Sequence, residues 1–389
     1  MSKNETTSDI CIIGGGLAGK TAALKLAQTG STVTLCASKP TMVDTRTTAL
    51  LMQTVTFFKE IGIWDKLYEK AFPLKIMRIV DGSNRLIRTP QTDFKSSEID
   101  LEAFGYNLKN ADILKVLEDA ISELPNINQV EGKVQTVTSQ GNHEHISIET
   151  NEGLKTVTTN FVVGADGRNS IVRTSKSVKA REWEYPQAAI VVNFKHDKST
   201  QFTSTEFHTE TGPFTVVPHS NHEAGLVWME KPENVENLLS LSAPDFERVL
   251  EEKMQSFLGK ITLLNTPKSF PLKGLVANQF GNDNWALIGE AAHVFPPIGA
   301  QGFNLGVRDI EAVAETLSRY TNQENRGQHY NRSRNHDINT RTYGVDMLNR
   351  SLLSDFLPVQ MIRGIGLHVL GSIKPLRKYV MKMGISPNI

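Results

Sequence analysis

The fold is decided by the stretch DICIIGGGLAGKT, which runs from Asp9 to Thr21. A short apolar strand leads into consecutive glycines, and these glycines satisfy two phosphate-binding signatures at once. Gly14, Gly16 and Gly19 spell G-x-G-x-x-G, the fingerprint of dinucleotide-binding proteins. The same letters spell G-x-x-x-x-G-K-T, the P-loop of enzymes that bind nucleoside triphosphates. The two signatures predict different folds and different ligands.

Three features favour the dinucleotide fingerprint over the P-loop. The strand 9–13 ends directly on Gly14, which is the tight join that the dinucleotide turn requires. A helix can then run as far as Gly30, where a glycine suits the end of the helix before the next strand. The sequence shows no convincing apolar strand ending in Asp that would hold the magnesium ion of a P-loop enzyme. We therefore predict a Rossmann-like turn with Leu17 and Ala18 at its edge.

The second strand, from Ser31 to Cys36, should end in an acid that binds the adenosine ribose, about twenty residues past the glycines. Cys36 stands at that position. A neutral thiol is a poor partner for two hydroxyl groups, so the ribose contact is expected to be weak here. An acid introduced at Cys36 should therefore tighten cofactor binding.

Length and composition are those of a globular protein with room for two domains. The chain has 389 residues, of which 39% are hydrophobic and 22% charged. Basic and acidic residues both number 42, so no overall field favours nucleic acid. The two cysteines, Cys11 and Cys36, indicate a reducing compartment, and the polar first residues lack a signal peptide. We expect a cytoplasmic protein. The histidines form no metal-binding pattern, so we expect no metal site.

The order of the elements predicts an α/β fold with an α+β insert, in which a β-sheet domain interrupts a Rossmann-like domain. Residues 48–68 read as one helix because their apolar residues share a face. Strand-like runs fill residues 185–230. The expected division is a nucleotide-binding domain from 1–75, 105–180 and 270–330, a β-sheet substrate domain from 76–104 and 181–269, and a helical C-terminal segment from 331–389.

Residues 350–389 carry an uneven charge. Six basic residues and one acid, Asp355, lie among many apolar side chains. Pro358 and several glycines argue against a transmembrane span. A basic, apolar segment can lie on an anionic membrane, but a helix packed on the body with a solvated basic edge fits equally well.

Two later stretches are also typical of a ligand pocket. VGADGRNS, at 163–170, follows a strand and opens a short helix, with Asp166 and Gly167 at the turn. LIGEAAHVFPPIGAQGFNLGVRDI, at 287–310, runs from a strand through a proline–glycine loop into an amphipathic helix. Gly299 and Gly302 leave backbone N–H groups bare at the start of that helix, which is a ready anion site. This loop suits a flat, partly anionic ligand.

In this order, the three stretches resemble the motifs of single-component flavoprotein monooxygenases that hydroxylate aromatic rings. The third motif of that family reads GDAAH-x-x-PP-x-GAQG-x-N, and Glu290 here replaces its Asp. DTRTTAL at 44–50, IGIW at 61–64 and FGYN at 104–107 are similar to the ubiquinone-biosynthesis hydroxylases within it. The tail from 349 to 376 matches as well.

The resemblance implies that FAD is the cofactor and that the flavin itself does the chemistry, so no catalytic side chain is assigned. The flavin face would meet Pro296, Pro297 and Gly299. The cofactor-binding residues that the resemblance and the motifs imply are Gly14, Gly16, Leu17, Ala18, Gly19, Cys36, Arg46, Asp166, Gly167, Gly289, Glu290, Pro297, Gly299, Gly302 and Asn304.

The implied reaction is hydroxylation of the aromatic ring of a polyprenylated phenol in ubiquinone biosynthesis. NAD(P)H or another donor would reduce the flavin, and O₂ would then form a C4a-hydroperoxyflavin that passes one oxygen to the ring. A ubiquinone-biosynthesis complex, and a membrane surface contacted through 350–389 on the inner face of the membrane, are the other implied partners. The substrate-wall candidates, each of which also suits plain core, are Phe202, Phe207, Phe214, Val216, Pro218 and Phe295.

Three alternatives share this scaffold. A hydroxylase of small soluble aromatics should not need the basic, apolar tail. A reductase of prenyl chains would consume no O₂. A non-catalytic FAD-binding subunit of a biosynthetic complex would tolerate the departures at Cys36 and Glu290.

Overall fold

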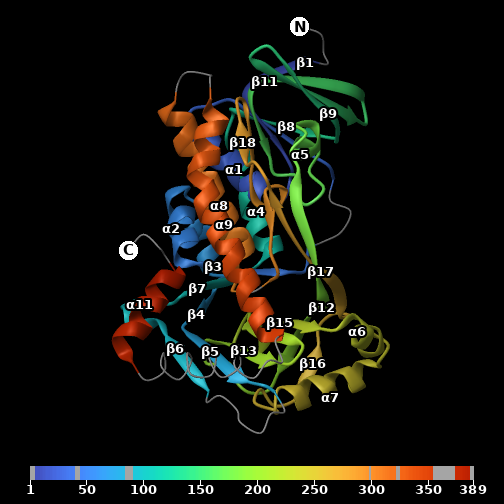
Figure 1. The fold of residues 1–389 in the computed structure, drawn as a ribbon, viewed down its shortest axis with the longest axis vertical. Helices are drawn as coiled ribbons and strands as arrows, with labels where there is room; N and C mark the ends of the chain where they lie inside the picture. The colour runs from blue at the N-terminus through green and yellow to red at the C-terminus, as the bar shows by residue number, and fades with distance from the viewer. Residues whose placement is uncertain are drawn as a thin grey trace.

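The computed structural model describes residues 5–39, 44–83, 91–297, 299–320, 325–353 and 373–385. Two large β-sheets and a small one are joined by helices, and the two large sheets lie at opposite ends of an elongated molecule (Figure 1). This is the α/β architecture with an inserted sheet that the sequence predicts. The C-terminal part, α9 (Arg326–Leu353) and α11 (Lys374–Ile385), is helical as predicted.

The first sheet has eight strands, in the order β18-β19-β11-β1-β2-β8, with β9 and β10 added beside β11. Its central strands are parallel and nearly uniformly apolar where they are covered on both faces, as Ile10–Ile13 and Phe161–Val163 show. The strands are β1 (Glu5–Ile13), β2 (Val33–Ala37), β8 (Ile127–Glu131), β9 (Lys133–Gln140), β10 (His143–Thr150), β11 (Gly153–Gly164), β18 (Gly281–Asn282) and β19 (Trp285–Leu287).

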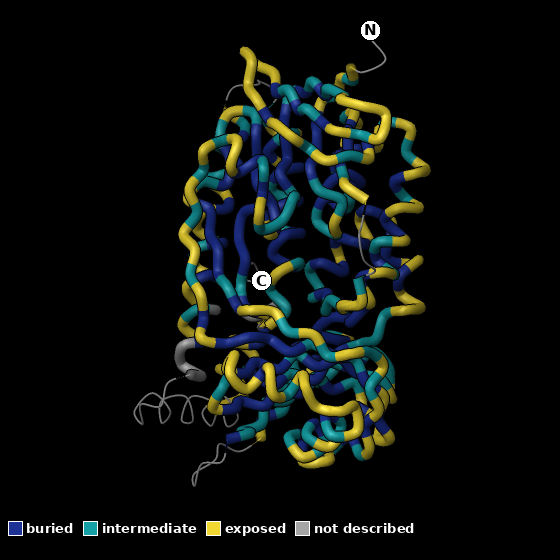
Figure 2. Tube along the Cα trace, turned by 90° about the vertical axis from the view of Figure 1, so that its right-hand side faces the viewer, coloured by how far each residue is buried: buried dark blue, intermediate teal, exposed yellow. Residues whose placement is uncertain are grey.

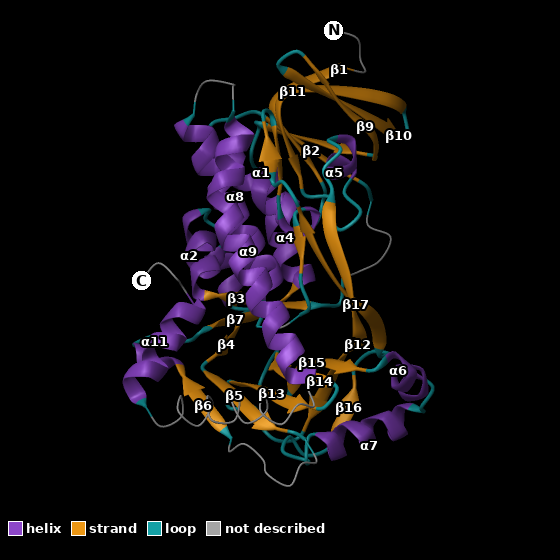
Figure 3. Ribbon diagram, in the orientation of Figure 1, coloured by secondary structure: helices purple, strands orange, loops and turns teal. Residues whose placement is uncertain are grey.

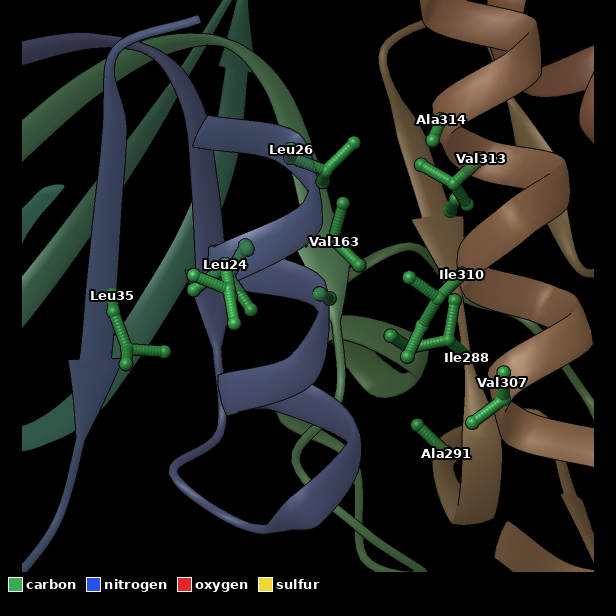
Figure 4. Close-up of a cluster of buried hydrophobic side chains, with 14 of the residues drawn as sticks. Leu24, Leu26, Leu35, Val163, Ile288, Ala291, Val307, Ile310, Val313 and Ala314 are labelled. Atoms are coloured by element: carbon green, nitrogen blue, oxygen red, sulfur yellow. The ribbon is translucent and has the colours of Figure 1, made fainter. Parts of the chain in front are cut away.

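Helices α1 (Leu17–Gln28), α4 (Asn110–Ser122) and α8 (Gln301–Arg319) pack beside this sheet, with α1 in contact with both of the others (Figure 3). Figure 4 shows Leu24 and Leu26 of α1 near Val163 of β11, with Val307 and Ile310 of α8 opposite. The buried core of the domain lies between these helices and strands. Figure 2 shows this buried interior running through the upper part of the molecule.

The second large sheet has nine strands, in the order β20-β17-β12-β15-β14-β13-β5-β6, with β16 beside β12. One face packs its alternate apolar side chains against α6 (Pro232–Leu239) and α7 (Ala243–Lys253). The strands are β5 (Ile76–Asp81), β6 (Thr92–Lys95), β12 (Ala180–His196), β13 (Thr203–Thr209), β14 (Gly212–Pro218), β15 (Glu223–Glu230), β16 (Ile261–Leu263), β17 (Lys268–Ala277) and β20 (His293–Val294).

A small sheet of β3 (Thr47–Leu51), β7 (Gly105–Lys109) and β4 (Phe72–Leu74) connects the two large ones. The single helix expected at 48–68 is therefore wrong. Its first residues pair with β7, and helix starts only with α2 (Met52–Glu60) and α3 (Trp64–Tyr68). The remaining short helices are η1 (Ser96–Ile99), α5 (Ile171–Ser175) and η2 (Gly289–Ala291).

The predicted basic tail, 350–389, falls only partly within the described residues, because 354–372 and 386–389 lie outside them. Within the described part, α11 packs Met381 against Ile99 and Phe104 and joins Arg377 to Glu98 at 2.6 Å. Across the described ranges, no helix combines the length and the apolarity that a membrane crossing needs.

Candidate cofactor and substrate site

The three sequence motifs meet at one edge of the first sheet. The DG turn is held to the end of β1 by a hydrogen bond from Ala165 N–H to Ile13 O, at 2.8 Å. The strand that opens the third motif is held to β11 by a bond from Ile288 N–H to Gly164 O, at 2.9 Å. Since β1, β11 and β19 are parallel neighbours, their carboxyl ends place the three turns side by side. A dinucleotide binds at such an edge.

The glycine turn is tight where the fingerprint demands glycine. Gly14 has a φ of +126°, and a Cβ on Gly19 would lie 1.8 Å from the carbonyl oxygen of Gly14. Gly16, by contrast, has open space where a Cβ would be, so a ligand can approach its backbone. Lys20 pairs with Glu118 of α4 at 2.5 Å. The lysine therefore points to a neighbouring helix, which is not the arrangement that a P-loop uses.

Asp166 offers a buried acceptor beside this turn. Its Oδ2 accepts hydrogen bonds from Ile171 N–H at 2.6 Å and Val172 N–H at 3.3 Å, which caps α5. Its Oδ1 is buried and, in the part of the chain that the structure describes, has no hydrogen-bond partner. Burial raises the pKa of Asp166, although hydrogen bonds to the carboxylate oppose the shift. An unpaired buried oxygen is costly, so this site fits a ligand that donates a hydrogen bond there.

The third motif supplies a bend and a helix start. Gly289 is buried with a φ of +56° and lies against Ala18 of α1, while Gly299 has a φ of +65°. Pro296 is buried and Pro297 is exposed. Helix α8 begins after Ala300 with no side-chain cap and no acid in its first turn, and Gly302 there has open space. Its free N–H groups fit an electron-rich ligand edge.

Asn304 fastens α8 to β3. Its Oδ1 accepts from Leu51 N–H at 2.9 Å and Thr54 Oγ1 at 2.7 Å, and its Nδ2 donates to two carbonyl oxygens. The side chain was predicted to bind the cofactor, but its hydrogen bonds are all made within the protein. These bonds hold the start of α8 against β3 and α2, and a contact of Asn304 with the cofactor stays a prediction.

Arg46 and Glu290 lie close enough for their charges to interact. Arg46 also donates twice to Asp44, each time at 2.8 Å. Burial alone would raise the pKa of Asp44, but hydrogen bonds from Arg46 and Asn110 outweigh it and lower the pKa to about 2. Arg46 and Glu290, the basic and acidic residues that the family resemblance implies, therefore lie in one cluster of charged side chains.

The structure places the Cys36 side chain away from the predicted ribose contact. Its thiol is 1% exposed and lies 3.5 Å from the sulfur of Cys11, inside the core. Ala37, not Cys36, is the residue of β2 that meets the glycine turn, because a Cβ on Gly15 would lie 2.6 Å from the Ala37 Cβ. The strand runs one residue further than expected, and the alternation of side chains turns the thiol inward.

The predicted substrate-wall residues separate into groups. Phe207, Phe214 and Val216 lie in the core between the second sheet and α6–α7. Phe202 stacks on Phe72 with ring centroids 5.3 Å apart. Phe295 stacks on His293 in the third motif, with ring centroids 5.2 Å apart. The structure does not bring the six together. Pro218 is buried at the end of β14, and its carbonyl accepts a hydrogen bond from Asn107 Nδ2 at 2.9 Å.

A buried ion network that sequence reasoning missed supports the third motif. Asp309 of α8 is fully buried and accepts from Gly289 N–H at 3.0 Å, His293 Nε2 at 2.7 Å and Arg334 Nε at 2.8 Å. Burial alone would raise the pKa of Asp309, but His293 and Arg334 hold it below its ordinary value. No spacing signal marks this cluster, because its members come from three separate elements.

Comparison with known proteins agrees with this geometry. A family model described as "FAD binding domain" matches residues 7–339. The chain is 29% identical to ubiquinone hydroxylase UbiL of Rhodospirillum rubrum, over 97% of this chain and 89% of that protein. It is 25% identical to the 3-demethoxyubiquinol 3-hydroxylase of Escherichia coli, over 97% and 98% of the two chains. The crystal structure of p-nitrophenol 4-monooxygenase from Pseudomonas putida superposes with a TM-score of 0.80 at 19% identity, and 97% of each chain is covered.

Proposed function

Because the chain belongs to the FAD binding domain family, we propose that this FAD-dependent monooxygenase hydroxylates the aromatic ring of a polyprenylated phenol on the route to ubiquinone. The convergence of the three motifs on one sheet edge is the observation that carries the proposal. Similarity to ubiquinone hydroxylases along almost the whole chain favours this route.

When bound, FAD takes up electrons from a donor such as NAD(P)H and activates O₂ for transfer of one oxygen atom. The protein's own residues bind and orient it. The open backbone at Gly16 admits the pyrophosphate, and Asp166 Oδ1 accepts from the cofactor beside it. The loop at Pro297 and Gly299 would contact the flavin, and the uncapped start of α8 would favour negative charge on its ring.

A hydroxylase of small soluble aromatics is the main alternative with the same fold. The likeness to p-nitrophenol 4-monooxygenase shows the shared architecture only. We favour the prenylated substrate because of the full-length similarity to ubiquinone hydroxylases and because the exposed basic helix α11 can lie on an anionic membrane. A peripheral position on the inner membrane face, and membership of a ubiquinone-biosynthesis complex, form part of this proposal.

The test is deletion of the gene followed by mass analysis of quinone intermediates. We expect loss of ubiquinone and accumulation of a prenylated ring that lacks one hydroxyl, whose position names the carbon attacked. The wild-type gene should restore ubiquinone, whereas Gly16→Val should not, because its side chain blocks the pyrophosphate. Lys20→Ala is the matched control and should restore it. Unchanged quinones in the deletion strain would reject the proposal.

A further inference from the structure

A cleft of about 320 Å³ lies where the small sheet meets the turn between β14 and β15. This volume is at the lower end of the range for small-molecule sites, roughly 300–1,000 Å³. One of its lining residues, Thr47, directly follows Arg46, the residue that is predicted to lie on the flavin side. The lining residues are Thr47, Lys70, Asn107, Leu108, Lys109, Asp112, His219 and Glu223.

His219 lines this cleft and has an unpaired ring nitrogen. Its Nε2 is buried and has no hydrogen-bond partner among the described residues, and the ring lies so close to Gly225 that a Cβ there would be 2.6 Å from Nε2. Burial, and then the charge of Lys109, lower the pKa of His219 to about 4. The imidazole is therefore neutral near pH 7, and a neutral imidazole carries one acceptor nitrogen.

Asn107 presents a second unpaired acceptor. The residue is 3% exposed, and its Nδ2 donates to Pro218 O at 2.9 Å. That bond fixes the amide, so the buried, unpartnered atom is the acceptor Oδ1. The same bond holds Asn107 against the peptide that precedes His219. The two unpaired atoms thus belong to residues that lie close together in space and line the same cleft.

Charged groups complete the lining. Lys70 is paired with Asp112 at 2.6 Å. Lys109 and Glu223 make no side-chain hydrogen bond or ion pair within the described part of the chain. The ligand chemistry that fits is an acidic hydroxyl, because it donates to the acceptors while its oxygen lies near a cation. An ether or a carbonyl offers acceptors only and would leave His219 and Asn107 unpaired.

We propose that this cleft binds the hydroxyl-bearing edge of the aromatic substrate, with the one hydrogen of the phenolic O–H shared between His219 Nε2, in the tautomer that leaves this nitrogen unprotonated, and Asn107 Oδ1, and with Lys109 beside the phenol oxygen. The proposal rests on the proposed function only in taking the ligand to be that enzyme's substrate. His219 and Asn107 would then determine specificity for a free phenol.

Phenol and its methyl ether, anisole, are the probes for a calorimetric titration of the full-length, FAD-loaded protein. We expect phenol to bind about tenfold or more tightly than anisole, since the ether leaves buried acceptors unpaired. His219→Leu should abolish this discrimination. His219→Gln keeps an acceptor and should retain part of it. His222→Leu, on the same turn but exposed, should behave like wild type.

Equal affinity for phenol and anisole in the wild type would overturn the proposal, and so would unchanged discrimination in His219→Leu. FAD content, measured for each variant, shows that the protein has folded. If His219→Leu fails to load FAD, Asn107→Asp provides the same test, because it alters the acceptor and should change the phenol-to-anisole ratio. The titration needs no turnover, so its failure is distinct from unchanged quinones in the deletion strain.

Discussion

At the scale of single residues, the placement of Cys36 reverses the effect expected of an acid there. A carboxylate at Cys36 would enter the core beside Cys11 with no partner. We expect Cys36→Glu to lower the free energy of unfolding by about 2–4 kcal/mol and to leave FAD binding no tighter. Thermal melts with FAD titration measure both, and Cys36→Ala is the small-residue control. A stable Cys36→Glu variant that binds FAD more tightly would instead support the ribose contact predicted at Cys36.

His219 gives stability a pH dependence. Its pKa is about 4 in the folded state, against 6.5 for an unperturbed histidine. The unfolded chain therefore binds more protons between these values, so stability is full above pH 6.5 and falls as the pH drops toward 4. The shift corresponds to about 3 kcal/mol. Asp44 acts in a separate window, because its stabilisation is lost only as the pH falls below 3.8 toward 2.

Denaturant unfolding at pH 7.0, 5.5 and 4.5 tests this dependence, with pH values chosen around the window of about 4 to 6.5 that the two pKa values define. The curve for His219→Gln should be flatter than that of the wild type across this window. His222→Leu is the control on the same turn. Parallel curves for wild type and His219→Gln would show that the ring is solvated in the folded protein.

At the scale of elements, α9 is joined to the third motif by ion pairs, of which Arg334–Asp309, at 2.8 Å, is the most deeply buried. Arg334→Met leaves the fully buried Asp309 with one cation fewer, and breaking a buried pair costs about 3–5 kcal/mol. Since Asp309 also binds Gly289 and His293, we expect weaker FAD binding together with lower stability. Apo-protein titration with FAD measures the first effect. Arg332→Met, an exposed neighbour on α9, should change neither, and an equal loss there would contradict the role of Asp309.

The sequence predicts elements best where a local constraint marks them. The glycine turn, the DG turn and the proline–glycine loop each require particular backbone shapes, so their places on strand ends could be predicted. Strand β3 could not, because its apolar residues continue the helical spacing of α2 and only its distant pairing with β7 makes it a strand. A role for His219 and Asn107 could not be predicted for a similar reason, because a lone histidine in a turn belongs to no recognisable sequence pattern.

At the scale of the whole molecule, the third motif joins the two large sheets. Strand β19 belongs to the first sheet and β20 to the second, and only η2 separates them. The third motif is therefore anchored in both large sheets. The sequence predicted the two units but not this shared segment, because β20 is two residues long and is defined by its pairing with β17.

The exposed side of α11 is where a membrane contact can be tested on the intact molecule. This helix lies beside β6 of the substrate sheet (Figure 1), and Leu376, Tyr379 and Val380 on it are 40%, 61% and 40% exposed. Lys378 and Lys382 are exposed beside them. Exposed apolar groups next to cations suit an anionic lipid surface, where each basic residue contributes about 1 kcal/mol.

Reversing Lys378 and Lys382 together to Glu should weaken sedimentation with phosphatidylserine-containing vesicles by at least about tenfold at low salt. Lys59→Glu combined with Lys66→Glu makes the same change in net charge on α2 and α3 and is the control. Binding by the wild type should fade at high salt, because screening shortens the attraction. FAD content should stay constant, since α11 contacts η1 and β6 and lies outside the three motifs. If both double variants bind vesicles as the wild type does, α11 is an ordinary packed helix and the substrate reaches the enzyme by another route.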